Sequence, residues 1–189
     1  MSMRISMLLC LFLLLGGCRE KYTPKPYGYH RIDFPEKSWR PVGDDLPYRF
    51  DMAATATVEP DTDKDAEPGW INISYPQYNA KIHLSYKKIA TDTSLRHFTE
   101  DCHRMAYTHT IKAESIQEQY FQHDRISGLI YFIEGNTASS TQFYVTDSVK
   151  HFLRGALYFK QHPDKDSLAP VIHYLRQDIV NLMETVRFK

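Results

Sequence analysis

The chain has 189 residues with 23 basic and 23 acidic side chains, so its formal net charge is zero. A balanced charge gives no reason to expect a nucleic-acid partner or an electrostatic attachment to a membrane. Thirteen tyrosines and ten phenylalanines are a high aromatic content, which favours a fold rich in β-strands.

Residues 1–17 have the features of a secretory signal peptide. Arg4 supplies a positive charge and the run 5–15 is apolar apart from one serine. This run is shorter than the roughly 20 residues that span a bilayer. Leu15-Gly-Gly-Cys18 matches a bacterial lipobox, so we predict that Cys18 becomes the lipid-modified first residue of the mature chain. The alternative is an ordinary signal peptide with an incidental cysteine at this position.

Residues 18–35 are expected to form a tether. Pro24, Pro26 and Gly28 oppose regular structure there. The segment also has more aromatic residues than a spacer requires, and they would dock either on a partner protein or back on the parent domain. The candidate partner-binding residues are Tyr22, Tyr27, Tyr29 and Arg31.

Residues 36–189 are predicted to form a single domain with several strands. Apolar residues alternate in 70–75 and 80–89, which is typical of a half-exposed antiparallel hairpin. The run 128–134 is apolar on both faces, so we expect it in the middle of a sheet that is covered on both sides. Gly155 suggests a bulge or close packing under a helix. Further strands are predicted over 48–52, 114–122 and the hairpin 138–159.

Two amphipathic helices are predicted. The first follows capping residues at 91–94 and ends near Thr110, with apolar residues at steps of three and four. The second begins at an N-cap Ser167, has Pro170 in its first turn, and carries an apolar stripe that must cover a sheet face. The fold class is therefore α+β, with a central antiparallel sheet and helices packed on its faces. The stripe of the second helix is Leu168, Ile172, Leu175, Ile179, Leu182 and Val186.

Few residues of the sequence are candidates for metal binding or for a reactive thiol. Asp61, Asp63 and Asp65 have the spacing of a calcium-binding loop. However, Ala66 and Asn72 occupy the positions at which such a loop needs Gly and Glu. We therefore interpret residues 61–67 as a solvated loop. Cys102 lies on the apolar stripe of the first helix and is best interpreted as a small buried hydrophobe. The histidines of that helix point to separate sides and cannot share one metal ion; they are His97, His103 and His109.

The sequence contains none of the common catalytic motifs that would indicate an enzyme. No Gly-x-Ser-x-Gly, His-Glu-x-x-His, phosphate-loop or dinucleotide motif is present, so no cofactor or metal is predicted. A triad of Ser140, His151 and Asp147 would rest on residue types alone. The polar run 136–140, with Ser139 and Ser140, could line a pocket, although a turn followed by the start of a strand is the simpler explanation.

Several stretches resemble the gliding motility lipoprotein GldD family of Bacteroidetes. The resemblance lies in the arm Tyr22–Pro35, in 65–72, 78–86 and 106–113, in 135–140 continuing through 151–159, and in 166–172. It implies a cell-envelope lipoprotein needed by the gliding machinery and the associated type IX secretion system, with no known catalytic residue. The strand and helix order is also similar to the Mog1/PsbP-like sandwich, by fold analogy alone.

The predicted function is thus a non-enzymatic, lipid-anchored accessory or assembly factor whose partners are other envelope lipoproteins. Arg19, which follows Cys18, is not the aspartate associated with inner-membrane retention, so the periplasmic leaflet of the outer membrane is favoured. Two alternatives stay open: a periplasmic hydrolase or peptidoglycan-acting enzyme, and a small-ligand or calcium-binding lipoprotein.

Overall fold

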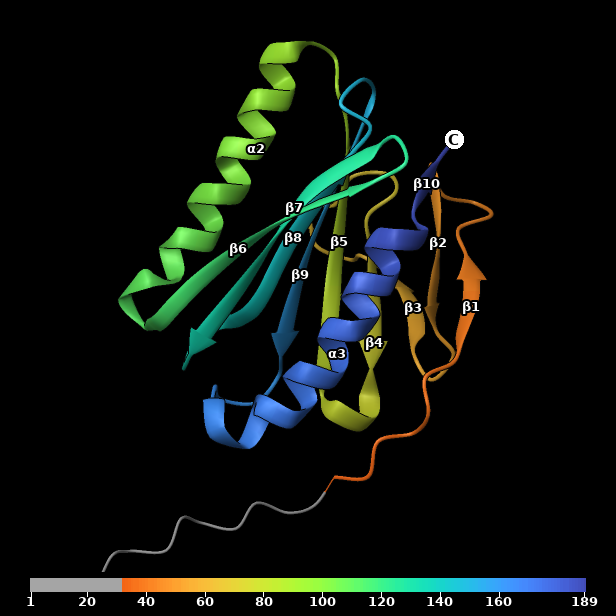
Figure 1. Ribbon diagram of the computed structural model, residues 1–189. Helices are drawn as coiled ribbons and strands as arrows, with labels where there is room; N and C mark the ends of the chain where they lie inside the picture. The colour runs from red at the N-terminus through yellow and green to blue at the C-terminus, as the bar shows by residue number, and fades with distance from the viewer. Residues whose placement is uncertain (1–31) are drawn as a thin grey trace, which may run out of the picture. The chain divides into compact units, whose positions relative to one another are not determined.

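A seven-stranded antiparallel sheet organises the molecule, with strand order β3-β4-β5-β9-β8-β7-β6 (Figure 1). The computed structural model describes residues 32–189, which form one compact unit. The strands of this sheet are β3 (Thr57–Pro60), β4 (Ile71–Tyr75), β5 (Ala80–Lys88), β6 (Ala113–His123), β7 (Ile126–Gly135), β8 (Ser139–Thr146) and β9 (His151–Phe159).

A smaller sheet with order β1-β2-β10 lies beside the C-terminal helix, because β2 packs against that helix. Its strands are β1 (Trp39–Val42), β2 (Tyr48–Ala53) and β10 (Arg187–Phe188). The helices are α2 (Asp92–Tyr107) and α3 (Lys165–Thr185), and two short 3₁₀ turns are η1 (Pro76–Tyr78) and η2 (Thr108–Ile111). Within residues 32–189, no helix is both long and apolar enough to cross a membrane.

The two helices cover opposite faces of the large sheet. Ile130 of β7 belongs to the main core with α3, whereas its neighbours Leu129 and Tyr131 pack with Ala106 of α2. Side chains that alternate along a strand point to opposite faces, so α2 and α3 must lie on different sides. The predicted α+β fold class, with helices on the faces of an antiparallel sheet, is confirmed.

The predicted half-exposed alternation of the first hairpin is confirmed for β5 but not for β4. All five residues of β4 are buried, Asn72 and Ser74 included, so both faces of that strand are covered. Ile82 and Leu84 are fully buried and Tyr86 nearly so, while Lys81, His83 and Ser85 are only half-buried on the other face. The pattern predicts this because one face of β5 meets the core below α3.

The expected position of the strand over 128–134 was wrong. β7 is apolar on both faces and covered by both core clusters, but the central strand is β9, and β7 pairs with the edge strand β6. Two apolar faces therefore report that both sides are covered, and do not report how far a strand lies from the sheet edge.

The start of α3 also differs from the prediction. Asp164 is the N-cap, and its side chain accepts hydrogen bonds from the backbone N–H groups of Asp166 and Ser167. The helix therefore begins before Ser167, and Pro170 lies in its second turn, on the exposed side. Leu168 and Ile172 of the expected stripe are only half-buried. The face that packs consists of Val171, Tyr174, Leu175, Asp178, Ile179, Leu182 and Met183.

The first helix is shorter and less buried than predicted. Thr91 is its N-cap and accepts a hydrogen bond from Ser94, as expected from the capping sequence. The α-helix ends at Tyr107, and the 3₁₀ turn η2 replaces its last turn. Only Cys102 and Ala106 are buried, while Met105 is 39% exposed.

Gly155 does not form a bulge. It pairs in regular register with Leu84 on one side and Phe143 on the other. A Cβ atom at this position would meet the Phe143 ring at 2.2 Å, so the glycine is required by a cross-strand aromatic ring that lies over it.

Candidate functional site

The residues that the sequence marks most strongly lie outside the described part of the chain. Cys18 and the candidate partner-binding residues of the tether fall within 1–31, whereas the structure describes 32–189. The lipid on Cys18 and a binding role for the tether therefore stay predictions. They concern Tyr22, Tyr27, Tyr29 and Arg31.

The segment just after them, Phe34–Lys37, is bound to α3, and we call it the N-terminal strap. The Phe34 ring stacks on Tyr174 of α3, with centroids 4.5 Å apart, and also contacts Tyr78 at 5.8 Å. The Tyr174 hydroxyl donates a hydrogen bond to the Pro35 carbonyl at 3.0 Å. Aromatic stacking and one hydrogen bond from the Tyr174 side chain to the strap backbone thus hold the strap against the helix.

A buried ion pair fastens the end of the strap. Lys37 Nζ lies 2.7 Å from Asp178 Oδ1, donates to the Tyr174 carbonyl at 2.9 Å, and sits 3.2 Å from the centre of the Tyr174 ring. The side chains of Lys37 and Asp178 are 15% and 2% exposed. Burial lowers the pKa of Lys37 even though the Asp178 carboxylate acts to raise it.

Sequence reasoning missed this pair. Lys37 and Asp178 are 141 residues apart, and no local pattern links them. The one available signal was Asp178 itself, a charged residue on the apolar face of a helix, where such residues are almost never found without a partner.

Next to α3 runs an open groove of about 520 Å³, which we call the α3 groove. Trp39 and Val180 border it and are 42% and 37% exposed. Phe132 of β7 also lines the groove, as does Gln117 of β6. A groove with apolar walls and a polar rim is suited to a side chain or a peptide segment.

Arg176 lines the α3 groove, and its guanidinium is held by several neighbouring groups. Its guanidinium lies 2.7 Å from Glu134, donates to the Thr141 hydroxyl at 3.1 Å and to the Ser140 carbonyl at 3.0 Å, and covers the Phe132 ring. The predicted polar run therefore serves structural bonding. Ser139 and Ser140 are buried and do not border the groove.

The hypothetical triad is not assembled. Ser140 lies at the start of β8, whereas Asp147 and His151 lie at the turn after its other end. Ser140 and Thr146 are six positions apart along β8, which corresponds to about 20 Å at 3.3 Å per residue. His151 instead contacts the Tyr86 hydroxyl at 2.8 Å through Nδ1 and stacks on Phe188.

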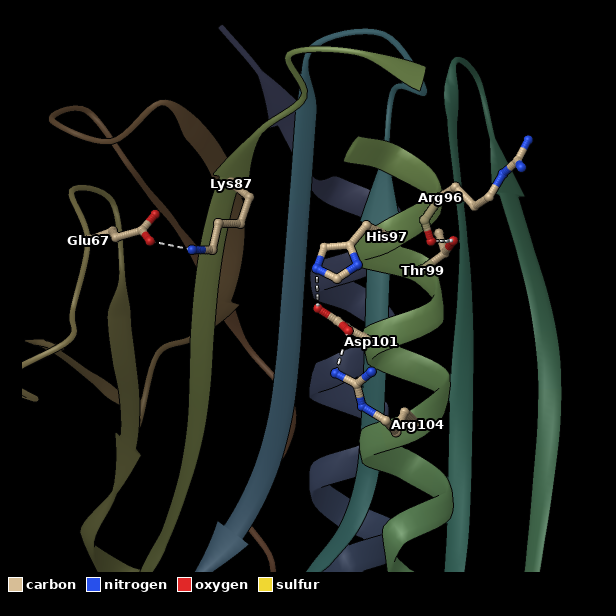
Figure 2. Close-up of polar contacts among 7 residues, drawn as sticks. All are labelled: Glu67, Lys87, Arg96, His97, Thr99, Asp101 and Arg104. Atoms are coloured by element: carbon tan, nitrogen blue, oxygen red, sulfur yellow. Dashed lines mark hydrogen bonds and ion pairs between the residues drawn. The ribbon is translucent and has the colours of Figure 1, made fainter. Parts of the chain in front are cut away.

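A small cleft of about 110 Å³ lies between α2 and the sheet. Two of its lining residues, Asp101 and Lys87, are drawn in Figure 2, and both are engaged in ion pairs: Asp101 with His97 and Arg104 along α2, and Lys87 of β5 with Glu67. Cys102 faces the cleft, and burial raises the pKa of its thiol to about 12. The thiol is therefore protonated at neutral pH and is not an activated nucleophile.

Metal binding gains no support from the described residues. Between Ile32 and Lys189, no group of three or more His, Cys, Asp or Glu side chains is placed to hold a metal ion. In the acidic loop, the Asp61 carboxylate accepts a hydrogen bond from the backbone of Asp63 at 3.0 Å, as in an ordinary Asx turn.

The sheet with a helix on each face defines the fold class of this protein. The fold is of the PsbP/Mog1-like type: it is similar to the solution structure of cyanobacterial PsbP (CyanoP) from Synechocystis sp. PCC 6803, with a TM-score of 0.50 over 88% of this chain and 99% of that chain. At 12% identity this similarity concerns the fold alone. A search of curated proteins gave no match.

The family is shown by a separate comparison. A family model described as gliding motility lipoprotein GldD matches residues 19–188. The chain therefore belongs to the GldD family of gliding motility lipoproteins, as its resemblance implied.

Proposed function

We propose that this protein is a non-enzymatic, membrane-anchored accessory or assembly factor of the gliding motility and type IX secretion machinery. The observation that carries the proposal is the family match over residues 19–188, nearly the whole chain after the predicted signal peptide. The separation of Ser140 from His151 and the protonated state of Cys102 support a binding role over catalysis.

In this proposal Cys18 carries the lipid and faces the periplasm from the outer membrane. Acyl chains contribute about 0.8 kcal/mol per buried CH₂, so several chains on one residue give stable attachment. The tether, with Tyr22, Tyr27 and Tyr29, then contacts other envelope lipoproteins of the same apparatus. The strap, which follows the tether in the chain, is itself held to α3 by Phe34 and Lys37.

The test replaces the protein in a gliding bacterium that carries it. Cys18→Ala should abolish lipid labelling, shift the protein out of the membrane fraction, and stop both colony spreading and type IX secretion. Cys102→Ala is the matched control and should retain all four properties, because the Cys102 thiol is buried within the folded domain. An unlipidated but fully functional wild-type protein would contradict the proposal.

A second variant tests the non-enzymatic assignment. Ser140→Ala removes a hydroxyl that is buried and makes no hydrogen bond within residues 32–189. We expect normal spreading and secretion. Loss of both by a Ser140→Ala protein with an unchanged melting temperature would favour an enzyme.

A further inference from the structure

The outer edge of β6 is long and open. β6 ends the seven-stranded sheet and, with eleven residues, is its longest strand (Figure 1). Among residues 32–189, no strand pairs with it on the side away from β7. Such an edge presents a row of backbone N–H and C=O groups that can pair with another chain.

The other sheet edges of the described region are protected. β3, at the opposite end of the large sheet, has four residues and ends in Pro60. β1 has four residues and contains Pro41. Short length and proline are the usual means of preventing edge pairing. The remaining edge strand, β10, has two residues. β6 has no Pro, Lys or Arg, and its register irregularity lies at its start, between Ala113 and Ser115, so the edge from Ile116 to His123 is left without these protections.

Two hollows flank β6 on opposite faces of the sheet. On the α3 side lies the α3 groove, which Gln117 helps to line. On the α2 side lies a second hollow of about 610 Å³, lined by Tyr120 and Gln122 of β6 and by Arg96 of α2. A strand added to β6 would direct alternate side chains towards these two sides, which is how strand-addition sites achieve specificity.

Exposed apolar groups occur at both ends of the edge. Tyr120 is 82% exposed within β6, and Ile111 of η2, just before the strand, is 91% exposed. They are the most exposed of the large hydrophobic side chains between residues 32 and 189. Apolar side chains on an added strand would bury them.

We propose that β6 binds an extended segment of a partner polypeptide by strand addition. The charge of β6 defines the partner. Glu114 and Glu118 are the charged residues of β6 when His123 is neutral, and the strand carries no Lys or Arg. Glu114 pairs with Lys165, while Glu118 accepts a hydrogen bond from the Tyr107 hydroxyl and lies 3.8 Å from His103. A second copy would therefore bring two more carboxylates to this edge and no basic residue of its own strand to pair with Glu118. The segment that fits is therefore non-acidic, with a basic side chain opposite Glu118 and an apolar one opposite Tyr120. This inference rests on the proposed role as a protein-binding accessory factor.

The first test maps the register of pairing. A photo-crosslinking amino acid is placed in the full-length protein in cells at Gln117 or at Gln119, which are exposed neighbours on one face of β6. The crosslinked residues of the partner should be two apart in its sequence, within a non-acidic segment. Val58 on the protected edge strand β3 is the matched control and should give no such pair.

Other crosslinking results would overturn the proposal. Links to β6 of a second copy would show self-association, and links to residues 19–31 of the same chain would show that the tether occupies the edge. Links scattered over a partner surface would show ordinary side-chain docking. If wild type retains partners in a pull-down but gives no links at β6, the edge proposal fails while the proposed function stands; if no partner is retained, the proposed function fails.

The second test separates backbone from side-chain recognition. Backbone N–H groups alternate in direction along an edge strand, so one of the positions 119 and 120 donates outward. Gln119→Pro and Tyr120→Pro are compared with Gln119→Ala and Tyr120→Ala. Proline at the position whose N–H pairs with β7 removes a hydrogen bond of the sheet and lowers the melting temperature. The proline variant that keeps the wild-type melting temperature therefore identifies the outward position. At that position proline should lower the crosslinking yield about tenfold relative to alanine, because an N–H donor is lost and its acceptor is left unpaired. Equal yields for proline and alanine would contradict strand addition.

Discussion

At the scale of single residues, the Lys37–Asp178 pair makes the sharpest claim about stability. Lys37→Met should lower the free energy of unfolding by about 3 kcal/mol, because it leaves the Asp178 carboxylate buried without a counter-charge. Urea denaturation of the domain measures the loss. Asp178→Leu added to Lys37→Met should recover much of it, since two apolar residues can replace a buried pair.

Lys81→Met provides the comparison. Lys81 also forms an ion pair, with Glu59 at 2.6 Å, but both side chains are substantially exposed. Such surface pairs contribute about 0–1 kcal/mol, so Lys81→Met should change stability little. Equal effects of Lys37→Met and Lys81→Met would show that burial of the strap pair is unimportant.

The environment of Asp147 predicts that the stability of the domain depends on pH. Its carboxylate accepts backbone N–H bonds from Val149, Lys150 and His151 at 3.0, 2.9 and 2.8 Å. Burial acts to raise the pKa of Asp147, but these bonds outweigh it and hold the pKa below its ordinary value. The stabilising contribution of the charge is therefore present above about pH 4 and is lost as the pH falls through the lowered folded-state pKa.

Asp147→Asn keeps the acceptor oxygen and removes the charge. The difference in unfolding free energy between wild type and this variant should be largest near pH 6 and should shrink as the pH falls below about 4. Urea denaturation at a series of pH values measures it. A difference that stays constant over this range would mean that the charge has no role.

At the scale of elements, α3 stabilises the domain through the one face that packs against the sheets. Ile179 is fully buried there, whereas its neighbour Val180 is 37% exposed. Ile179→Asp should destabilise the domain by about 4 kcal/mol or more, because it buries a charge without a partner, and Val180→Asp should cost about 0.5 kcal/mol. Thermal or urea unfolding compares the two, and similar losses would contradict the assignment of the packed face.

Local patterns predicted the elements better than their arrangement. Alternation identified β5 because that strand buries one face, and capping residues placed the start of α2. β4 was also located by its alternating apolar residues, but both of its faces are buried. β1, β3 and β10 were missed because strands of two to four residues are too short to show a period. The central place of β9 depends on pairing between distant strands, which composition does not encode.

The same limit applies to the candidate site. The sequence predicted the lipid anchor because the lipobox is a local motif. It did not predict the strap, whose contacts join Phe34 and Lys37 to α3 over more than 130 residues. The open edge of β6 could not be recognised either, since a strand becomes an edge only through the order of the whole sheet.

At the scale of the whole molecule, the strap is expected to contribute to the stability of the entire domain. A chain of residues 38–189 should unfold at a lower urea concentration than a chain of residues 32–189, by about 3–5 kcal/mol in free energy, because it loses the Phe34 stacking and leaves Asp178 unpaired. Asp178→Leu in the shorter chain should reduce the gap. Equal midpoints for residues 38–189 and 32–189 would show that the strap adds nothing to the fold.

The position of the strap has a mechanical consequence. A force applied to the N-terminal segment reaches α3 first, through the Phe34–Tyr174 stack and the Lys37–Asp178 pair, and not a strand that could be peeled from the sheet edge. Phe34 touches the η1 turn, which connects β4 and β5, whereas β6 is the edge strand at the other end of the sheet, separated from β5 by β9, β8 and β7. Pulling on the tether and capture of a partner strand would thus load separate elements, so the domain could stay attached to a moving partner without its sheet being unzipped.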